Sequence, residues 1–294
     1  MSAKPALHPD AAVGASLQAI ARAILADARA AIESAARSDA EAVHRFRREM
    51  KRWRALLRLL DPFLAAEGRR LRTRARDLAR ALGGARDAQA ALDGIADIAG
   101  HGVALSARSL ATLRGKVEEI RRSAEGTILT GDMRLRLTDA LDDADSSVAR
   151  WSFDALTFAQ VADRLARGYR AARRANPEHW PDADADELHE FRKRIVNHRY
   201  QMETVAPLWP RFGKMWVGEA QRLRERLGKH QDLLVLARLA EPHQSLARWR
   251  SRLMPAIEKR KAGLVRSARR IATRLLLDKP KAFRRRLEVM WDTG

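Results

Sequence analysis

Apolar residues recur along the chain at helical spacing, and the alternation typical of strands is nearly absent. Residues 39–60 carry an apolar stripe at spacings of three and four: Val43, Phe46, Met50, Trp53, Leu57 and Leu60. Residues 184–205 carry a similar stripe: Leu188, Phe191, Ile195, Met202 and Val205. Each stripe covers one side of a helix and must face a core. The pattern predicts an all-α protein.

Glycine and proline positions divide this helical pattern into segments. We expect the breaks to lie between helices at Asp61-Pro62, Gly83-Gly84, Gly100-His101-Gly102, Gly126, Gly131, Asn176-Pro177, Pro207, Gly228 and Pro242. Ser38 with Glu41, and Asp184 with Glu187, have the spacing of a capping box and predict the starts of two helices.

An internal repeat organises the chain. Residues 44–87 resemble residues 189–232 at a constant offset of 145 residues and without a gap. The matching pairs include His44 with His189, Phe46 with Phe191, Arg47 with Arg192, Arg54 with Arg199, Pro62 with Pro207, Gly83 with Gly228, and Asp87 with Asp232. The period is too long for a solenoid unit. It predicts a duplicated helical bundle about a pseudo-twofold axis, with one half in residues 1–150 and the other in residues 151–294.

A second stripe on the helix at residues 39–60 is basic. It comprises His44, Arg47, Lys51, Arg54 and Arg58, with Arg48 and Arg52 beside it and only Glu49 as an interspersed acid. Like charges at these spacings repel and destabilise a helix by roughly a few tenths of a kcal/mol per pair. The stripe spans roughly 21 Å at about 1.5 Å per residue, which suits an extended anion.

The second copy preserves part of this stripe in His189, Arg192 and Arg199, with Lys193 beside it and Glu203 at its end. A solvated charged face is the alternative reading, but solubility alone does not explain why both copies keep the histidine and two arginines. Arg22 and Arg167 also match at the offset of 145 residues. Cations and a helix start surround His44, so we expect its imidazole to be mostly neutral.

Composition narrows the class of partner. The 57 Lys and Arg residues exceed the 37 Asp and Glu residues, giving a formal net charge of +20. Such a charge attracts nucleic acid, anionic membranes or other polyanions. The chain has no cysteine, so thiolate chemistry and disulfides are excluded. Neither a signal peptide nor a transmembrane stretch is apparent, and we expect a cytoplasmic protein.

These residues together resemble the CHAD domain, the conserved-histidine α-helical domain. The resemblance rests on HRFRREMKRWRALLRLL at 44–60, HEFRKRIVNHRYQMET at 189–204, and the Leu-Gly…Asp turns at 82–92 and 227–236. It implies two pseudo-symmetric four-helix bundles with a basic surface for inorganic polyphosphate, and association with polyphosphate granules. The binding residues expected on this basis are Arg22, His44, Arg47, Arg48, Lys51, Arg52, Arg54, Arg58, Arg167, His189, Arg192, Lys193 and Arg199.

The second copy departs from the family pattern. Val196 stands where a basic residue is preferred, His198 replaces an apolar residue, and Gln231 replaces Arg86. We therefore expect the second half to bind more weakly. Asp87 and Asp232 are expected to anchor basic side chains, because a carboxylate would repel the anion.

The sequence also bears on three other classes of function: catalysis, RNA binding and adsorption to an anionic surface. The chain lacks a Glu-x-Glu-x-Lys motif, phosphate-binding glycine loops and a zinc-binding histidine pair, so we expect no enzyme, cofactor or metal. Nonspecific RNA binding is the main alternative, although only 5% of residues are aromatic and the stripes place them in the core. The basic segment 279–286, with Phe283 and Trp291 nearby, fits either an anchor to an anionic surface or a solvated helix.

Overall fold

A computed structural model describes residues 5–34, 38–83, 86–102, 105–124 and 129–294, and in these ranges it contains helices and no strand. The predicted all-α class is confirmed. The predicted breaks at Gly84 and Gly126 lie outside the described residues. The helices are α1 (Val13–Glu33), α2 (Asp39–Leu59), α3 (Asp61–Ala81), α4 (Arg86–Ala99), α5 (Ala107–Ala124), α6 (Gly131–Ala149), α7 (Phe158–Arg174), α8 (Ala185–Glu203), α9 (Pro210–Leu239), α10 (Arg250–Leu275) and α11 (Pro280–Asp292), with short 3-10 turns η1 (Ala206–Leu208) and η2 (Ala247–Trp249).

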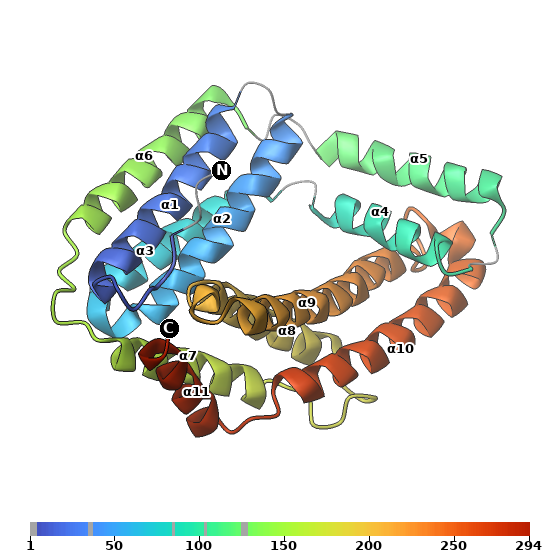
Figure 1. The fold of residues 1–294 in the computed structure, drawn as a ribbon. Coiled ribbons are helices and arrows are strands. Elements are labelled where there is room, and N and C mark those ends of the chain that lie inside the picture. Colours follow the sequence, from blue (N-terminus) through green and yellow to red (C-terminus); the bar gives the residue numbers. More distant parts are fainter. Residues whose placement is uncertain (1–4, 35–37, 84–85, 103–104, 125–128) are drawn as a thin grey trace.

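The larger hydrophobic core joins the two repeats through α2 and α8. Helices α1 and α3 pack against α2, α6 packs mainly against α1, and α7 and the start of α9 pack around α8 (Figure 1). Phe46, Met50, Trp53 and Leu57 of the predicted apolar stripe are all buried in this core. The amide of Gln201 on α8 donates a 3.2 Å hydrogen bond to the carbonyl of Ala55, and this bond ties the two helices together directly.

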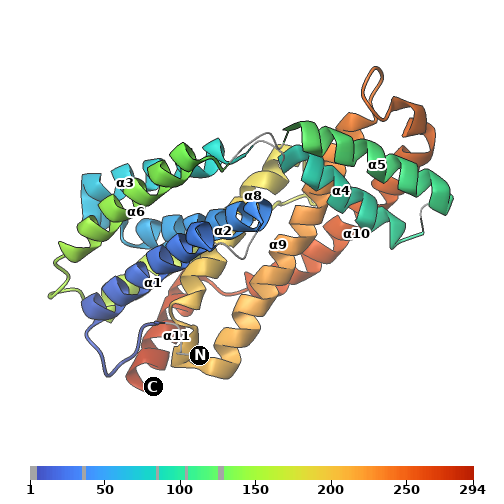
Figure 2. The same cartoon turned by 90° about the horizontal axis from the view of Figure 1, so that it is seen from above.

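A second core lies at the other end of α9. Helices α4 and α5 pack there against the last part of α9 and the first part of α10, around Leu113, Leu233 and Leu253 (Figure 2). The helices of residues 86–124 thus pack on helices from the second half of the chain. Packing therefore crosses the predicted boundary at residue 150.

The helix starts follow the predicted capping residues. The hydroxyl of Ser38 accepts a hydrogen bond from the backbone amide of Glu41, and the Asp184 carboxylate accepts from the amides of Asp186 and Glu187. Helix α1 begins at Val13 and α7 at Phe158, an offset of 145 residues, while α2 begins at Asp39 and α8 at Ala185. The helices therefore follow the spacing of the sequence repeat.

The predicted break at Gly228 is wrong, because α9 runs without interruption through this residue. The corresponding Gly83 does separate α3 from α4. The first copy has two consecutive glycines at this point and the second copy has one. A single glycine costs a helix only about 1 kcal/mol, which tertiary packing readily offsets.

Two residues singled out from the sequence are buried. His198 accepts a 2.9 Å hydrogen bond from Trp216 Nε1, and burial lowers the pKa of His198 to about 4. His198 therefore takes the place of an apolar stripe residue as a neutral imidazole within the core. Phe283 is also buried and stacks on Tyr169, so it cannot act as a surface anchor. Among the described residues, no helix is both long and apolar enough to cross a membrane.

The second core contains a charged junction at Asp97. This α4 carboxylate is 2.8 Å from Lys229 Nζ of α9 and 2.6 Å from Arg260 Nε of α10. Burial alone would raise the pKa of Asp97, but hydrogen bonds from Arg260 and Lys229 outweigh burial and lower it to about 2. The junction links three helices through one carboxylate.

We expect Asp97→Asn to lower the free energy of unfolding by about 3 kcal/mol, because it leaves two cations facing a buried neutral group. Because the folded-state pKa is depressed, this stabilisation is present above the unfolded pKa and is lost as the pH falls toward 2. Thermal unfolding measured from pH 7 to pH 2 checks both points. The exposed Asp87 on the same helix supplies the matched control, Asp87→Asn, and equal effects of the two substitutions would contradict the prediction.

Candidate anion-binding site

The predicted basic stripe lies along the solvent-accessible side of α2, beside the buried apolar stripe. His44 and Lys51 are exposed, and Arg47, Arg54 and Arg58 are partly exposed. Within the described part of the chain, none of these five side chains forms an ion pair with a carboxylate. The stripe therefore presents uncompensated positive charge.

Cations from three other helices join the first half of this stripe. Arg86 of α4, Arg192 of α8 and Arg224 of α9 all lie close enough to Lys51 for their charges to lower its pKa. We call His44, Arg47, Lys51, Arg86, Arg192 and Arg224 the central basic cluster.

Side chains on one face of α9 act on both repeat histidines. Arg224 contributes to the field at His44, the ring of His189 contacts the Gln231 amide, and Gly228 lies between them under the Arg192 guanidinium. Residues 224, 228 and 231 are spaced by four and three and share one side of the helix. This face of α9 therefore contacts His189 and carries a cation, Arg224, whose charge acts on His44.

The two motif arginines pack against the matching Leu-Gly pairs. Arg47 Nη1 donates a 2.9 Å hydrogen bond to the Leu82 carbonyl, which is free because the chain breaks there between α3 and α4. A methyl group on Gly228 would lie 3.5 Å from Nε and Nη2 of Arg192. In α9 the Leu227 carbonyl stays within a continuous helix, and the buried Nε of Arg192 has no hydrogen-bond partner among the described residues.

The close approach of these cations shifts their acid–base equilibria. Burial, followed by the charges of Lys51, Arg48 and Arg47, lowers the pKa of His44, in the direction predicted from sequence. Burial and neighbouring arginines lower the pKa of Lys51 to about 8 and that of Arg192 to about 10. Lys51 is accessible to solvent yet surrounded by protein atoms and cations, and such a position favours a bound anion.

The second half of the stripe has its own set of cations. The charges of Arg72, Arg76 and Arg80 on α3 lower the pKa of Arg54 after the effect of burial. Burial, then Arg54, Arg72 and Arg194, lower the pKa of Arg58 to about 10. We call these the outer basic cluster: Arg54, Arg58, Arg72, Arg76, Arg80 and Arg194. The two clusters adjoin along α2.

Not every member of the two clusters lacks an acidic neighbour. Arg72 pairs with Asp61, Arg76 with Asp77 and Arg194 with Glu190. Arg224 lies 3.8 Å from Glu225, whereas Arg54 and Arg192 form no ion pair with a described carboxylate. The Nε atoms of these three arginines are buried without a hydrogen-bond partner among the described residues. Each guanidinium carries further N–H donors, and Arg can pair with phosphate oxygens through two parallel hydrogen bonds.

Three predicted site residues pair with acids outside the basic stripe: Arg48 and Arg52 on α2, and Arg199 on α8. Arg48 and Arg52 both bind the buried carboxylate of Glu49, at 2.8 and 2.7 Å. Arg199 pairs with Glu203 at 2.7 Å. These residues line a separate hollow of about 800 Å³ beside α1 and the start of α9. Internal acids compensate their charges, although Arg48 still lies close enough to His44 of the central basic cluster for its charge to lower the pKa of that histidine.

The remaining predicted cations are also apart from the clusters or paired. Arg22 is exposed on α1 and lies near Asp145 of α6. Arg167 pairs with Asp163 at 2.9 Å, and Lys193 pairs with Glu190. The anchoring role expected of Asp87 and Asp232 stays a prediction: neither forms an ion pair with a described cation, but Asp232 lies close enough to Arg192 and Arg86 for their charges to act on it. Burial and Asp93 outweigh these cations and raise the pKa of Asp232 to about 6.

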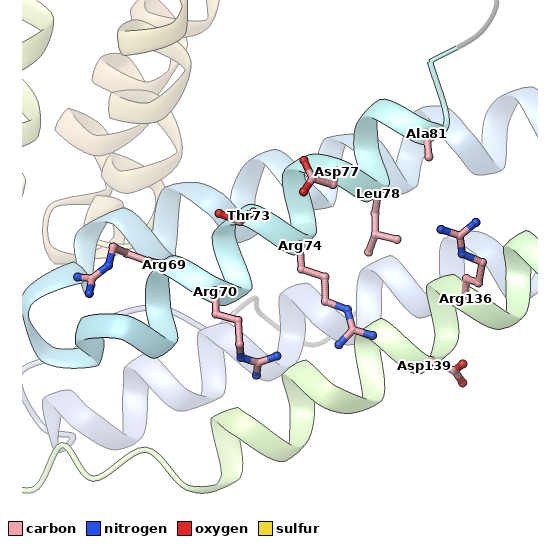
Figure 3. A pocket seen from close by; sticks show the side chains of 9 residues that line it. All are labelled: Arg69, Arg70, Thr73, Arg74, Asp77, Leu78, Ala81, Arg136 and Asp139. Atoms are coloured by element: carbon pink, nitrogen blue, oxygen red, sulfur yellow. The ribbon is translucent and has the colours of Figure 1, made fainter.

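Another hollow, of about 690 Å³, lies between α3 and α6 and is also lined by arginines. Figure 3 shows Arg70 and Arg74 extending from α3 toward α6, with Arg136 and Asp139 on the facing helix. Arg70 and Arg74 both bind Asp143, at 2.8 and 2.7 Å. This hollow is therefore a worse anion site than the α2 stripe. No group of three or more metal-ligating residues occurs in the described ranges.

Replacing Lys51 with methionine should stabilise the free protein, because it removes a charge held among cations. The gain should be about 1 kcal/mol or less, since solvent screens an exposed charge. The folded pKa of about 8 lies below the unfolded value, so the gain is complete below pH 8 and disappears as the pH approaches 10.5. Thermal unfolding at pH 7 and pH 10 checks this expectation. Lys193→Met, which removes an ion-paired lysine, serves as the control and should give no gain.

Comparison with known proteins agrees with the fold and the repeat motifs. A CHAD domain family model matches residues 19–241. The crystal structure of the CHAD domain from the plant Ricinus communis is 22% identical and covers 97% of this chain and 95% of its own, with a TM-score of 0.58, so the two share a fold. No curated protein matches the chain. Because the family model covers most of the chain, this protein belongs to the CHAD domain family.

Proposed function

We propose that this protein binds inorganic polyphosphate, without catalysing a reaction on it, through the central and outer basic clusters. The observation that carries the proposal is the convergence of cations from α2, α3, α4, α8 and α9 along one stripe whose α2 members form no ion pair with a described carboxylate. Holding these charges together is unfavourable in the free protein, and a polyanion would relieve the repulsion.

The shape of the stripe suits a linear anion. From His44 to Arg58 it extends about 21 Å along α2, and further cations lie on both sides of it. Polyphosphate carries about one charge per phosphate and can meet successive arginines along this length. The family resemblance supports this choice of anion, and we further propose that the protein meets polyphosphate in the cytoplasm, including at granules.

The absence of exposed rings in the two clusters favours a ligand without bases. The aromatic residues nearest the stripe in sequence, Phe46 and Trp53, are 0% and 2% exposed, and Phe191 on α8 is also buried. Proteins that bind single-stranded nucleic acid usually stack bases on accessible aromatic rings. Nonspecific RNA binding is the alternative, driven by the same phosphate contacts.

We also propose that the two halves arose by duplication into pseudo-symmetric four-helix bundles and that the first copy dominates binding. Lys51 and Arg58 correspond to Val196 and Glu203 in the second copy. Helix α8 thus retains Arg192 as its main contribution to the central basic cluster. The second stripe has fewer cations and an internal acid, which weakens it.

The deciding experiment is a competition between long-chain polyphosphate and single-stranded RNA of equal charge at physiological salt. We expect polyphosphate to bind more tightly, and its affinity to fall linearly on a log–log plot against salt concentration. Preferential binding of the RNA would overturn the proposal.

Charge reversal of Arg47, Arg54 and Arg192 together should weaken polyphosphate binding at least about a hundredfold, since each charged contact contributes about 1.5–3 kcal/mol.

A matched control separates local contact from net charge. Arg108, Arg114 and Arg122 are exposed on α5 and form no ion pair with a described carboxylate, so their reversal changes the net charge equally. That variant should retain polyphosphate affinity within about threefold. Far-UV circular dichroism should show the same helix content in both triple variants. Equal loss of binding by the two would mean that only the overall charge matters.

Binding should weaken as the pH rises through 8, because Lys51 then loses its proton. A bound anion favours the protonated amine, so binding above pH 8 should be accompanied by proton uptake. We expect about a fivefold loss of affinity between pH 7 and pH 9.5, equivalent to about 1 kcal/mol. Isothermal titration calorimetry in buffers of different ionisation enthalpy measures both quantities. Lys51→Arg keeps its charge and should flatten the dependence; an unchanged slope would exclude Lys51 as its source.

A further inference from the structure

Exposed apolar side chains gather at one end of the molecule, away from the basic clusters. In the described part of the chain five large apolar residues are exposed, and four of them lie on α9, on α11, in the α10–α11 loop or at the residue between η1 and α9. Trp209 and Met215 are 50% exposed, Val289 is 51% exposed and Leu277 is 73% exposed. The fifth, Leu135, lies on α6.

A chain of contacts connects two of these residues, Trp209 and Leu277. Trp209 stacks on Phe212 with ring centroids 5.2 Å apart, and the Arg286 guanidinium lies 5.4 Å from the Phe212 centroid. Arg286 also binds Asp278 at 2.6 Å, and Leu277 immediately precedes Asp278. The start of α9 and helix α11 lie at the same end as the C-terminus (Figure 2). Trp209 and Leu277 therefore belong to one surface, and Met215 and Val289 lie on the two helices, α9 and α11, that meet there (Figure 2).

Uncompensated cations surround the same surface. Arg211, Lys214, Lys279, Lys281 and Arg285 are all exposed, and none forms an ion pair with a described carboxylate. The local acids are engaged, since Asp278 pairs with Arg286 and Glu288 with Arg284. Lys281, Arg285 and Val289 follow each other at spacings of four on one face of α11. We call the four apolar residues and five cations the terminal patch.

We propose that the terminal patch binds the surface of an anionic lipid bilayer. Trp is favoured at the boundary between headgroups and hydrocarbon, and Leu277, Met215 and Val289 supply apolar groups that can enter it. Basic residues near an anionic leaflet add electrostatic attraction to the insertion of apolar groups. The combination of exposed apolar groups with unpaired cations distinguishes this patch from the α2 stripe, which has cations alone.

The charge of the patch favours a lipid over a second copy of the chain. A twofold-symmetric dimer would place the same surface on both partners and bring the five unpaired cations of each against those of the other. Like charges that face each other across an interface oppose association. An anionic bilayer satisfies both the cations and the apolar residues.

The terminal patch is separate from the polyphosphate surface proposed above. Met215 and Arg224 are nine residues apart on α9, about 14 Å along its axis. The other cations of the central basic cluster belong to α2, α4 and α8. The lipid proposal therefore does not rest on the polyphosphate proposal, and one protein could engage both anions.

The test uses vesicles of phosphatidylcholine with and without about 30% phosphatidylglycerol. We expect the protein to sediment with the anionic vesicles at physiological salt and to remain in solution with phosphatidylcholine alone. Trp209→Ser with Leu277→Ser, or Lys214→Glu with Lys281→Glu, should each reduce the bound fraction at least about fivefold. Leu135→Ser and Lys116→Glu alter exposed residues elsewhere and should have little effect.

Insertion can be read directly because the chain has no cysteine. A polarity-sensitive dye on Leu277→Cys should shift to the blue with anionic vesicles, whereas the same dye on Leu135→Cys should not. Arg47→Glu with Arg192→Glu should lose polyphosphate but keep vesicle binding. The proposal would be overturned if the unaltered protein did not sediment with anionic vesicles, or if the dye responded equally at both positions. It would also be overturned if the protein formed a dimer that the substitution Trp209→Ser abolished.

Discussion

The burial of one side of α2 determines where this protein carries its positive charge. Phe46, Met50, Trp53 and Leu57 enter the larger core and tie α2 to α8. Burying four such side chains contributes several kcal/mol, roughly 1.5–3 each, against a few tenths for each repulsive charge pair on the helix. The core therefore holds the cations of α2 together, although they repel one another.

Much of this could be predicted from sequence because helical periodicity and the repeat carry the information. Both fix which residues of α2 and α8 share a side. Arg86 and Arg224 were missed as site residues for a definite reason: their counterparts in the other copy are Gln231 and Ala79, so the repeat gives no signal. Their approach to Lys51 depends on how α4 and α9 pack against α2, which is a tertiary property.

The errors are equally instructive. Arg48 and Arg52 lie one residue beyond Arg47 and Lys51, about 100° further around the helix, and that rotation carries them to Glu49 and Glu203. Arg199 matches Arg54 in the repeat, yet the residue four positions later is Glu203 in one copy and Arg58 in the other. One substitution thus converts an uncompensated cation into an ion-paired one without disturbing the fold.

The same reasoning explains why two basic surfaces of one protein suit different partners. On α2 every large apolar side chain is buried in the core. The exposed side of the helix therefore presents only charged groups, which suits an anion without apolar parts. At the start of α9, Phe212 supports Trp209 from beneath, while Trp216 and Phe283 behind it already fill the core. Trp209 is therefore displaced to the surface, and the cations around it meet an apolar group as well. The kind of anion that a basic helix can bind therefore depends on whether the hydrophobic residues beside its cations are buried in the core or exposed to solvent.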